Sequence, residues 1–282
     1  MTAPSPTDSV AGFYESHPIN EGQILDKMRA DGVDLDNLTE DVLQNYDQDH
    51  FGGTAANDAL AALAGIDAGC LVLDVCSGMG GPSRYLAHHH GCRVTGIDLM
   101  QSRVDGARRL TAMAKLDDRV AFEQANALDL PFDDGGFDVV IGQEAFCHIP
   151  DKDRLIGQCA RVLRPGGRLA FTDILATERT SDETRARQQH EMTMFELATR
   201  DGYSRRLAAE GCVVEAVEDL SEPWREILID RLAIYRGLKD QTVASFGAEH
   251  FARWDRAYAF FVGCYETGEL GGARFLAHRA VT

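Results

Sequence analysis

The stretch "VLDVCSGMGGPSR", residues 72–84, decides the fold, because an apolar run leads directly into a glycine-rich loop and a helix-like stretch follows. Such a unit brings bare backbone N–H groups and a helix N-terminus close to a ligand. Gly78 and Gly80 form G-x-G, but the third glycine of the dinucleotide-binding fingerprint would fall at Ser83. No G-K-[ST] follows, which argues against a nucleoside-triphosphate loop. The loop therefore predicts a ligand that passes close to backbone, without naming it.

The rhythm of strand, helix and strand continues along the chain. Helical patterns separate several apolar or β-branched runs, which lie at 71–75, 93–97, 119–123, 137–141 and 168–174. This alternation predicts an α/β fold with a doubly wound, mostly parallel sheet and helices on both faces. In "RVLRPGGRLAF", Pro165 is expected to end a helix, and the two glycines after it to form the turn into a strand.

Two helical regions are additional to the expected sheet. Residues 1–55 are interpreted as an N-terminal helical lid, and residues 56–282 as one domain with a helical insertion at about 222–267. The insertion falls between an expected strand at 212–219 and the last strand, "ARFLAHR". Extra helices at the carboxyl edge of an open α/β sheet usually cover the ligand crevice.

Composition excludes several classes of partner. The net charge of −17 would repel a nucleic-acid backbone. No window approaches the roughly 18 uninterrupted apolar residues of a membrane span, and no secretion signal is recognisable at the N-terminus. The seven cysteines form no C-x-x-C pair, so we expect reduced thiols, a cytoplasmic location and no metal site. The run "HHH" at 88–90 is interpreted as a solvated helix end.

Two carboxylates indicate the cofactor. Asp74 stands in the first expected strand, and Asp98 ends the second. A carboxylate at Asp74 would oppose a pyrophosphate but attract an ammonium group, and one at the end of the second strand typically binds two ribose hydroxyls. A ligand with a ribose and an ammonium group but no phosphate fits S-adenosylmethionine and not NAD. The alternatives are a helix N-cap at Asp98 and a loop-bracing hydrogen bond at Asp74.

Residues 70–175 resemble the class I S-adenosylmethionine-dependent methyltransferases of the small-molecule type. The acid-x-G-x-G-x-G pattern of that family corresponds to "DVCSGMG", with Cys76 in place of the first glycine. Two later segments, "NALDLPFDDGGFDVV" and "ARVLRPGGRLAFTD", match in order and spacing. The resemblance implies a Rossmann-like sheet of seven strands and S-adenosyl-L-methionine as the cofactor.

The resemblance also implies roles for individual residues. Asp74 and the backbone around Gly78 and Gly80 would hold the methionine part of the cofactor, and Asp98 would bind its ribose. The adenine would be contacted by Leu99, Met100, Asn126 and Ala127. Gln143 would lie beside the methionine end of the cofactor.

The segment "IGQEAFCHIPD", residues 141–151, is the best guide to the acceptor. It is similar to segments of the sarcosine/dimethylglycine N-methyltransferases, and to those of the phosphoethanolamine N-methyltransferases, which carry an acid at the position of Glu144 and a histidine at that of His148. Histidine suits the removal of an ammonium proton at neutral pH, and Glu144 could hold a cationic acceptor or orient the histidine. The alternatives are a helix-capping His148 and a sheet-edge salt bridge at Glu144.

The N-terminal segment "NYDQDHFGG" would lie over the donor, which makes Tyr46, Gln48, Asp49 and His50 candidates for lid or substrate contacts. Tyr14 joins them by analogy with the phosphoethanolamine enzymes. The expected activity is methyl transfer to a small molecule, with an amino-acid-like or amino-alcohol amine as the acceptor. Methylation of carbon, oxygen or sulfur in a lipid-like or natural-product acceptor is the alternative, and a non-catalytic cofactor-binding protein is another. A homodimer is left open.

Overall fold

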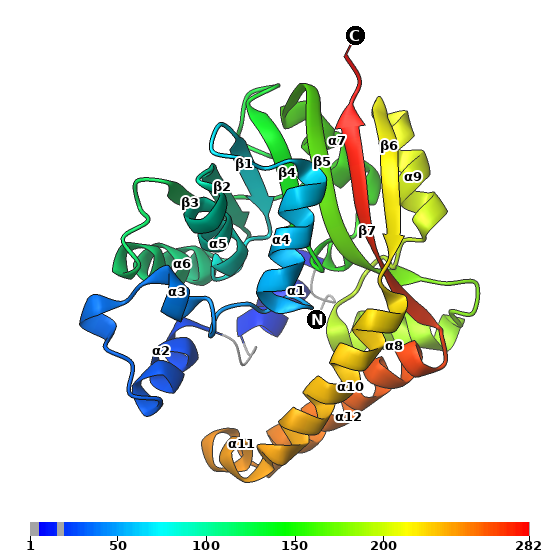
Figure 1. Cartoon of the computed structure of the whole chain (residues 1–282). Coiled ribbons are helices and arrows are strands. Elements are labelled where there is room, and N and C mark those ends of the chain that lie inside the picture. The colour runs from blue at the N-terminus through cyan, green and yellow to red at the C-terminus, as the bar shows by residue number, and fades with distance from the viewer. Residues whose placement is uncertain (1–5, 16–19, 282) are drawn as a thin grey trace.

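A seven-stranded sheet lies at the centre of the molecule in the computed structural model, which describes residues 6–15 and 20–281 (Figure 1). Its order is β3-β2-β1-β4-β5-β7-β6, and only β7 is antiparallel to its neighbours. The strands are β1 (Leu71–Val75), β2 (Arg93–Asp98), β3 (Val120–Gln124), β4 (Phe137–Gln143), β5 (Leu163–Ala176), β6 (Cys212–Asp219) and β7 (Leu270–Arg279). The prediction of a doubly wound, mostly parallel α/β sheet of seven strands is confirmed.

Helices cover both faces of the sheet. Three pack on one face, α4 (Gly53–Ala64), α5 (Gly81–His90) and α6 (Gln101–Met113). On the other face lie α7 (Lys152–Val162) and α9 (Arg200–Ala209). Successive side chains of a strand point to opposite faces. In β1, therefore, Val72 packs with the first group of helices, and Leu73 packs with the second.

The strand β5 begins earlier than its sequence indicates. It pairs with β4 from Leu163 and continues through Pro165, where a turn was expected. The register against β4 shifts between Phe137 and Val139, so the expected turn is a local irregularity within a longer strand. The helix before it, α7, still ends at Val162, as the proline predicts.

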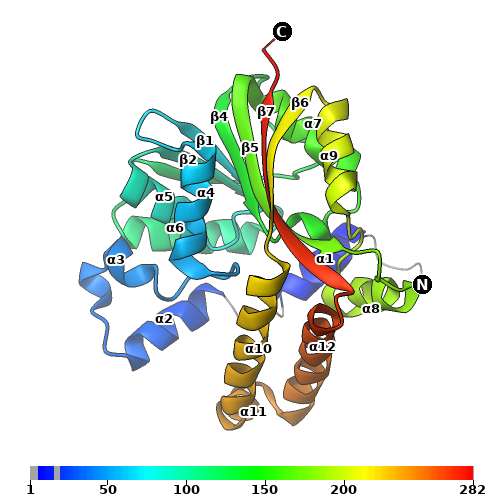
Figure 2. The same ribbon diagram turned by 45° about the vertical axis from the view of Figure 1, so that its right-hand side comes forward.

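Two groups of helices extend beyond the carboxyl ends of the parallel strands (Figures 1 and 2). The N-terminal group contains α1 (Pro6–Glu15), α2 (Glu21–Ala30), a 3-10 turn at Leu35–Asn37 and α3 (Glu40–Leu43). The C-terminal group contains α10 (Ser221–Gly237), α11 (Lys239–Phe246) and α12 (Ala248–Glu266), which we call the helical arm. Figure 2 shows α10 and α12 side by side, with α11 joining their far ends.

Two shorter elements complete the site. A 3-10 turn at Phe146–His148 follows β4, and α8 (Asp182–Met192) follows β5 and contacts α12. The division of the chain into a lid at 1–55 and a domain from 56 stays a proposal, and α4, which packs on the sheet, already begins at Gly53. Within the part of the chain that the structure describes, no helix has the length and apolar character needed to cross a membrane.

Candidate active site

A cavity of about 650 Å³ opens at the carboxyl ends of β1, β2 and β4. This is where open α/β sheets bind their ligands. The N-terminal helices and the helical arm close it from the other sides. Most residues predicted for the site line this cavity. They are Tyr14, Gln48, Asp49, His50, Asp74, Gly78, Asp98, Leu99, Met100, Asn126, Ala127, Gln143, Glu144 and His148.

The loop after β1 forms the floor of the cavity. Three of its residues have left-handed backbone conformations, Cys76 at φ 63°, Gly78 at 55° and Gly80 at 80°. Glycine adopts this region without cost, whereas other residues do so rarely. Cys76 therefore keeps the glycine-type conformation of the position that it occupies. Gly80 stands at the start of α5, where a Cβ atom would lie 2.4 Å from the Phe122 ring, so its role is close packing.

Asp98 links this loop to the start of α6. Its Oδ2 accepts a hydrogen bond from the Gly78 N–H (3.0 Å), and its Oδ1 accepts one from the Met100 N–H (2.9 Å). Met100, not Asp98, is the N-cap residue of α6. Burial raises the pKa of Asp98, and its backbone hydrogen bonds and the Arg103 guanidinium partly offset that rise. The carboxylate thus lines the cavity while it holds the loop in place.

Asp74 is 4% exposed and also lines the cavity. Its Oδ2 accepts a hydrogen bond from the Ser83 hydroxyl (2.5 Å), which is the loop-bracing bond weighed as an alternative. Burial, together with the nearby Asp98 carboxylate, raises the pKa of Asp74 to about 6, although the Ser83 hydrogen bond lowers it in part. Two carboxylates that share a poorly solvated cavity favour a cationic ligand, which would offset their charge.

Gln143 connects the end of β4 to the N-terminal segment. Its Nε2 donates to His50 Nδ1 (3.1 Å), and His50 Nε2 donates to Gln48 Oε1 (2.9 Å). Both ring nitrogens of His50 are therefore engaged, and burial lowers its pKa to about 4, which keeps the ring neutral. Gln143 Oε1 is buried and has no hydrogen-bond partner among residues 6–15 and 20–281. This oxygen is left to accept a bond from a ligand.

Glu144 tethers the N-terminal segment to the sheet. Its Oε1 accepts a hydrogen bond from the Thr172 hydroxyl (2.5 Å), and its Oε2 accepts one from the Phe51 N–H (2.6 Å). The residue has a left-handed backbone at φ 47°, a conformation that persists only where the surroundings hold it. Burial raises the pKa of Glu144 to about 7. The salt bridge weighed from sequence is replaced by these two neutral donors.

His148 ends the 3-10 turn after β4 and is buried. Its Nδ1 lies 3.2 Å from the carbonyl oxygen of Thr193 and 3.3 Å from the Thr193 hydroxyl. The carbonyl can only accept a hydrogen bond, so it favours the tautomer in which Nδ1 carries the proton and Nε2 is the basic nitrogen. The N-cap of α7 is Asp151, whose carboxylate accepts from the Arg154 N–H, so His148 does not cap this helix. The Tyr14 ring lies edge-on to His148 at 5.5 Å between centroids.

Tyr46 is directed elsewhere. Its hydroxyl donates to Asp31 Oδ2 (3.1 Å), and its ring packs among the N-terminal helices. Asn126, by contrast, lines the cavity and shapes the loop after β3, because its Oδ1 accepts a hydrogen bond from the Leu128 N–H (2.9 Å).

Known proteins show the family to which this chain belongs. The model of a methyltransferase domain matches residues 73–171. The 27-O-demethylrifamycin SV methyltransferase of Amycolatopsis mediterranei is 35% identical over 202 residues, which cover 70% of this chain and 74% of that protein. The chain is an S-adenosylmethionine-dependent methyltransferase. It is an enzyme that methylates small molecules, and S-adenosyl-L-methionine is its cofactor.

Other relatives resemble this methyltransferase over shorter or longer stretches of the chain. A sarcosine/dimethylglycine N-methyltransferase of Halorhodospira halochloris is 40% identical over 102 residues, which are 36% of this chain and only 37% of that protein. A structure of a putative sarcosine dimethylglycine methyltransferase from Galdieria sulphuraria shares the fold with a TM-score of 0.73 at 21% identity, over 80% of this chain and 86% of that one. A phosphoethanolamine N-methyltransferase from Haemonchus contortus, solved with S-adenosyl-L-methionine, has a TM-score of 0.77 at 20% identity, over 99% and 60% of the two chains.

The residues of the cavity fit this cofactor. S-adenosylmethionine carries a sulfonium and an ammonium group, and Asp74 and Asp98 supply the negative charge that such a ligand would offset. We propose that Asp74 and the unpartnered Gln143 Oε1 face the methionine part, and that Asp98 binds the ribose. Leu99, Met100, Asn126 and Ala127 stay our proposal for the adenine side, where all four line the cavity.

Sequence reasoning missed how the methyltransferase closes its cavity. Arg231 of α10 donates to the backbone carbonyls of Asp49 (3.0 Å) and His50 (2.7 Å) and so joins the helical arm to the N-terminal segment. Thr193, which orients His148, was also missed. No local pattern marks either residue, because their partners are far away in the chain. Several rings and thioethers outside the predicted site residues also line the cavity, namely Met192, Met194, Trp254, Tyr258 and Phe261.

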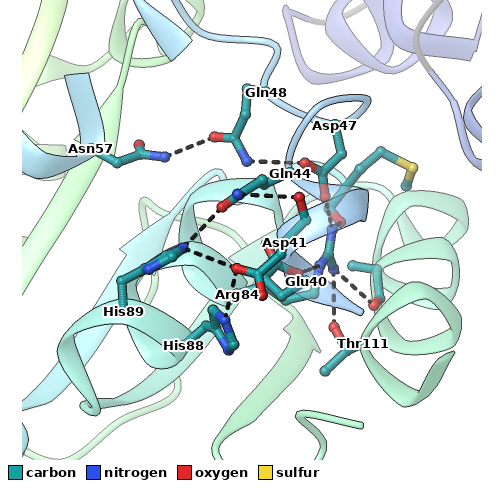
Figure 3. A network of polar contacts seen from close by, with 12 residues as sticks. Glu40, Asp41, Gln44, Asp47, Gln48, Asn57, Arg84, His88, His89 and Thr111 are labelled. Carbon is teal, nitrogen blue, oxygen red and sulfur yellow. Dashed lines mark hydrogen bonds and ion pairs between the residues drawn. The ribbon is translucent and has the colours of Figure 1, made fainter. Parts of the chain in front are cut away.

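A buried ion cluster joins the N-terminal segment to α5 (Figure 3). Arg84 is fully buried and donates to Asp47 Oδ2 (2.6 Å), while a carboxylate oxygen of Glu40 lies 3.5 Å from its Nε. Asp47 Oδ1 in turn accepts from Gln48 Nε2 (2.9 Å). Polar contacts thus run from Arg84 through Asp47, Gln48 and His50 to Gln143 in the cavity. No pattern in the sequence indicates this cluster.

Proposed function

We propose that this methyltransferase methylates a hydroxyl group of a bulky, largely apolar small molecule, and that His148 accepts the hydroxyl proton. The observation that carries the proposal is the apolar character of the cavity around His148. The Phe13 ring lies 6.2 Å from the His148 ring and 5.4 Å from the Trp254 ring, centroid to centroid. Met194 follows Thr193, and both Met194 and Trp254 line the cavity. An acceptor surrounded by such residues gains affinity by burying apolar surface.

The chain contributes positioning and proton removal. When bound, S-adenosylmethionine supplies a methyl group on a positively charged sulfur, which is already a reactive electrophile. The enclosed cavity holds the acceptor in place, and orientation of this kind supplies much of the rate in bimolecular reactions. The Thr193 carbonyl favours the Nδ1–H tautomer of His148, so Nε2 takes up the hydroxyl proton as the O–CH3 bond forms and the S–CH3 bond of the donor breaks. The name of the Amycolatopsis relative refers to a 27-O-demethyl substrate, which is consistent with an oxygen acceptor.

A small amine is the second candidate acceptor. The Asp49 and Glu144 carboxylates line the cavity and could attract an ammonium group, and the Halorhodospira relative is named for sarcosine and dimethylglycine. The engagement of both Glu144 oxygens by Thr172 and Phe51 favours the hydroxyl acceptor instead.

The test incubates the enzyme with labelled S-adenosylmethionine and two acceptor panels. One panel contains phenols, sterols and macrocyclic alcohols, and the other contains glycine, sarcosine, dimethylglycine and phosphoethanolamine. We expect label in the first panel, with mass spectrometry locating the methyl group on oxygen. Transfer to the amines alone would contradict the proposal.

Variants then test the assigned residues. His148→Ala should lower kcat by roughly 10²–10⁴-fold with unchanged affinity for S-adenosylhomocysteine. Trp254→Ala should raise the acceptor KM instead, because it removes apolar contact area. His278→Ala is the matched control, since His278 pairs with Glu215 on β6, away from the cavity. A His148→Ala enzyme with the wild-type rate would remove His148 from the chemistry.

A further inference from the structure

The surface beside the buried ion cluster carries a group of donor atoms that methyl transfer does not use. His88 and His89 lie in the last turn of α5, Asp41 lies in α3, and Gln44 follows α3 as its C-cap (Figure 3). Asp41 Oδ1 is 3.1 Å from His88 Nε2 and 4.0 Å from His89 Nε2. His89 Nε2 is also 2.9 Å from Gln44 Oε1. Two imidazole nitrogens thus converge on one carboxylate from another element.

We propose that Asp41, His88 and His89, with Gln44 as a fourth donor, bind a divalent metal ion of the zinc type and thereby clip α3 to α5. Two imidazoles with a carboxylate and an amide oxygen form a mixed nitrogen and oxygen set. Such a set suits zinc, nickel or copper, and it suits magnesium or calcium poorly, because these prefer oxygen alone.

The spacing of the Asp41, His88 and His89 ligand atoms approaches that of a tetrahedral site. Metal–ligand distances of about 2.0–2.2 Å place neighbouring ligand atoms roughly 3.3 Å apart. The ligand atoms of Asp41, His88 and His89 all lie within 4.8 Å of one another, and two of the distances measured here are 3.1 and 4.0 Å. The side chains of His88 and His89 are 35% and 33% exposed. Their rings can therefore rotate to shorten the distances between the ligand atoms, and a metal ion can reach them from the solvent.

Ordinary hydrogen bonding accounts for this arrangement only in part. His88 pairs with Asp41 and His89 pairs with Gln44, yet His89 also faces the same Asp41 oxygen at 4.0 Å, beyond hydrogen-bond range.

A metal ion at this position would also affect the cofactor cavity. Glu40 and Asp47 hold the inner side of this segment through the buried Arg84. A metal ion at Asp41 would hold the outer side of α3 to the same helix, α5. Residues 47–51, which follow α3, line the cofactor cavity. Metal binding should therefore stabilise the folded enzyme by closing the N-terminal segment onto α5.

Isothermal titration of the untagged, chelator-treated full-length enzyme with zinc chloride tests the site. We expect one equivalent to bind, and the melting temperature to rise with zinc. His88→Ala, His89→Ala and Asp41→Asn should each weaken zinc binding by at least about 10-fold, because the loss of a ligand should cost no less than the loss of a residue that merely orients one.

The neighbouring pair of His90 and Asp58 provides the matched control. These two side chains lie 3.4 Å apart on α5 and α4 but include a single imidazole. His90→Ala and Asp58→Asn should leave zinc affinity and the zinc-dependent melting shift unchanged. Zinc that binds the His88→Ala/His89→Ala enzyme as tightly as the wild type would overturn the proposal, because a thiol or another histidine would then hold it. The absence of saturable zinc binding by the wild type would overturn it as well.

Discussion

Replacement of Arg84 by methionine is the most informative perturbation of the N-terminal segment. Arg84 is 0% exposed, and it is the cation that faces the Asp47 and Glu40 carboxylates. Its guanidinium also donates to the Met79 carbonyl (2.8 Å) and to the Thr111 hydroxyl (3.0 Å). Methionine keeps most of the volume but removes the charge and every donor. The Asp47 carboxylate would then be buried without a counter-ion.

The expected cost follows from that unpaired charge. Removal of one partner of a buried ion pair destabilises a protein by about 3–5 kcal/mol. Each kcal/mol lowers the melting temperature by about 2–4 °C in domains of 150–250 residues, so we expect a fall of roughly 6–20 °C. Affinity for S-adenosylhomocysteine should fall too, because Asp47 and the four residues after it line the cofactor cavity.

Differential scanning calorimetry measures the first effect and titration calorimetry the second. Arg109→Met is the matched control, since Arg109 forms an ion pair with Glu21 but its side chain is 59% exposed. Exposed pairs contribute about 0–1 kcal/mol, so the control should melt close to the wild type. If Arg84→Met and Arg109→Met melt together, Arg84 does not compensate buried charge, and the reasoning is refuted.

Four further predictions concern the cofactor and the carboxylates. Asp98→Ala should weaken binding of S-adenosylhomocysteine by about 1–3 kcal/mol in titration calorimetry, because hydroxyl and N–H partners are left unpaired; unchanged affinity in a folded variant would remove Asp98 from the site. NAD should not raise the melting temperature, and a shift equal to that of S-adenosylhomocysteine would contradict the preference of Asp74 and Asp98 for a cation. Burial raises the pKa of Glu40 from 4.5 to about 8, so the contribution of this group to stability is complete below pH 4.5 and is lost as the pH rises through 8. Glu40→Gln should therefore flatten the fall in melting temperature between pH 4.5 and 8. Equal pH slopes of melting temperature in the wild type and the variant would count against the raised pKa. Glu144→Gln can accept only one of the bonds from Thr172 and Phe51, so it should loosen the N-terminal segment and raise the KM of donor and acceptor together, whereas a change in the acceptor KM alone would identify Glu144 as an acceptor contact.

The central part of the fold was predictable because its signals are local. The run at 71–75 coincides with β1, and the helix-like stretch after the glycine loop corresponds to α5. A buried apolar run, a glycine loop and a helix start are properties of neighbouring residues. The same is true of Asp98, whose Gly78 and Met100 partners belong to the loop and strand end that the pattern specifies. The early start of β5 was not predictable, because its first residues are extended only by pairing with β4.

The sequence by itself thus determined the sheet, the glycine loop, the two carboxylates and the cofactor, since each depends on backbone conformation and chemistry within a few residues. Only the tertiary structure decided how the cavity is closed. Glu144 meets the Phe51 N–H across 93 residues of chain, and Arg231 meets the His50 carbonyl across 181. Contacts of this kind form when helices pack and bring distant donors and acceptors together, and they leave no period or spacing in the sequence. For the same reason, the run "HHH" reads as a solvated helix end until α3 places Asp41 beside it.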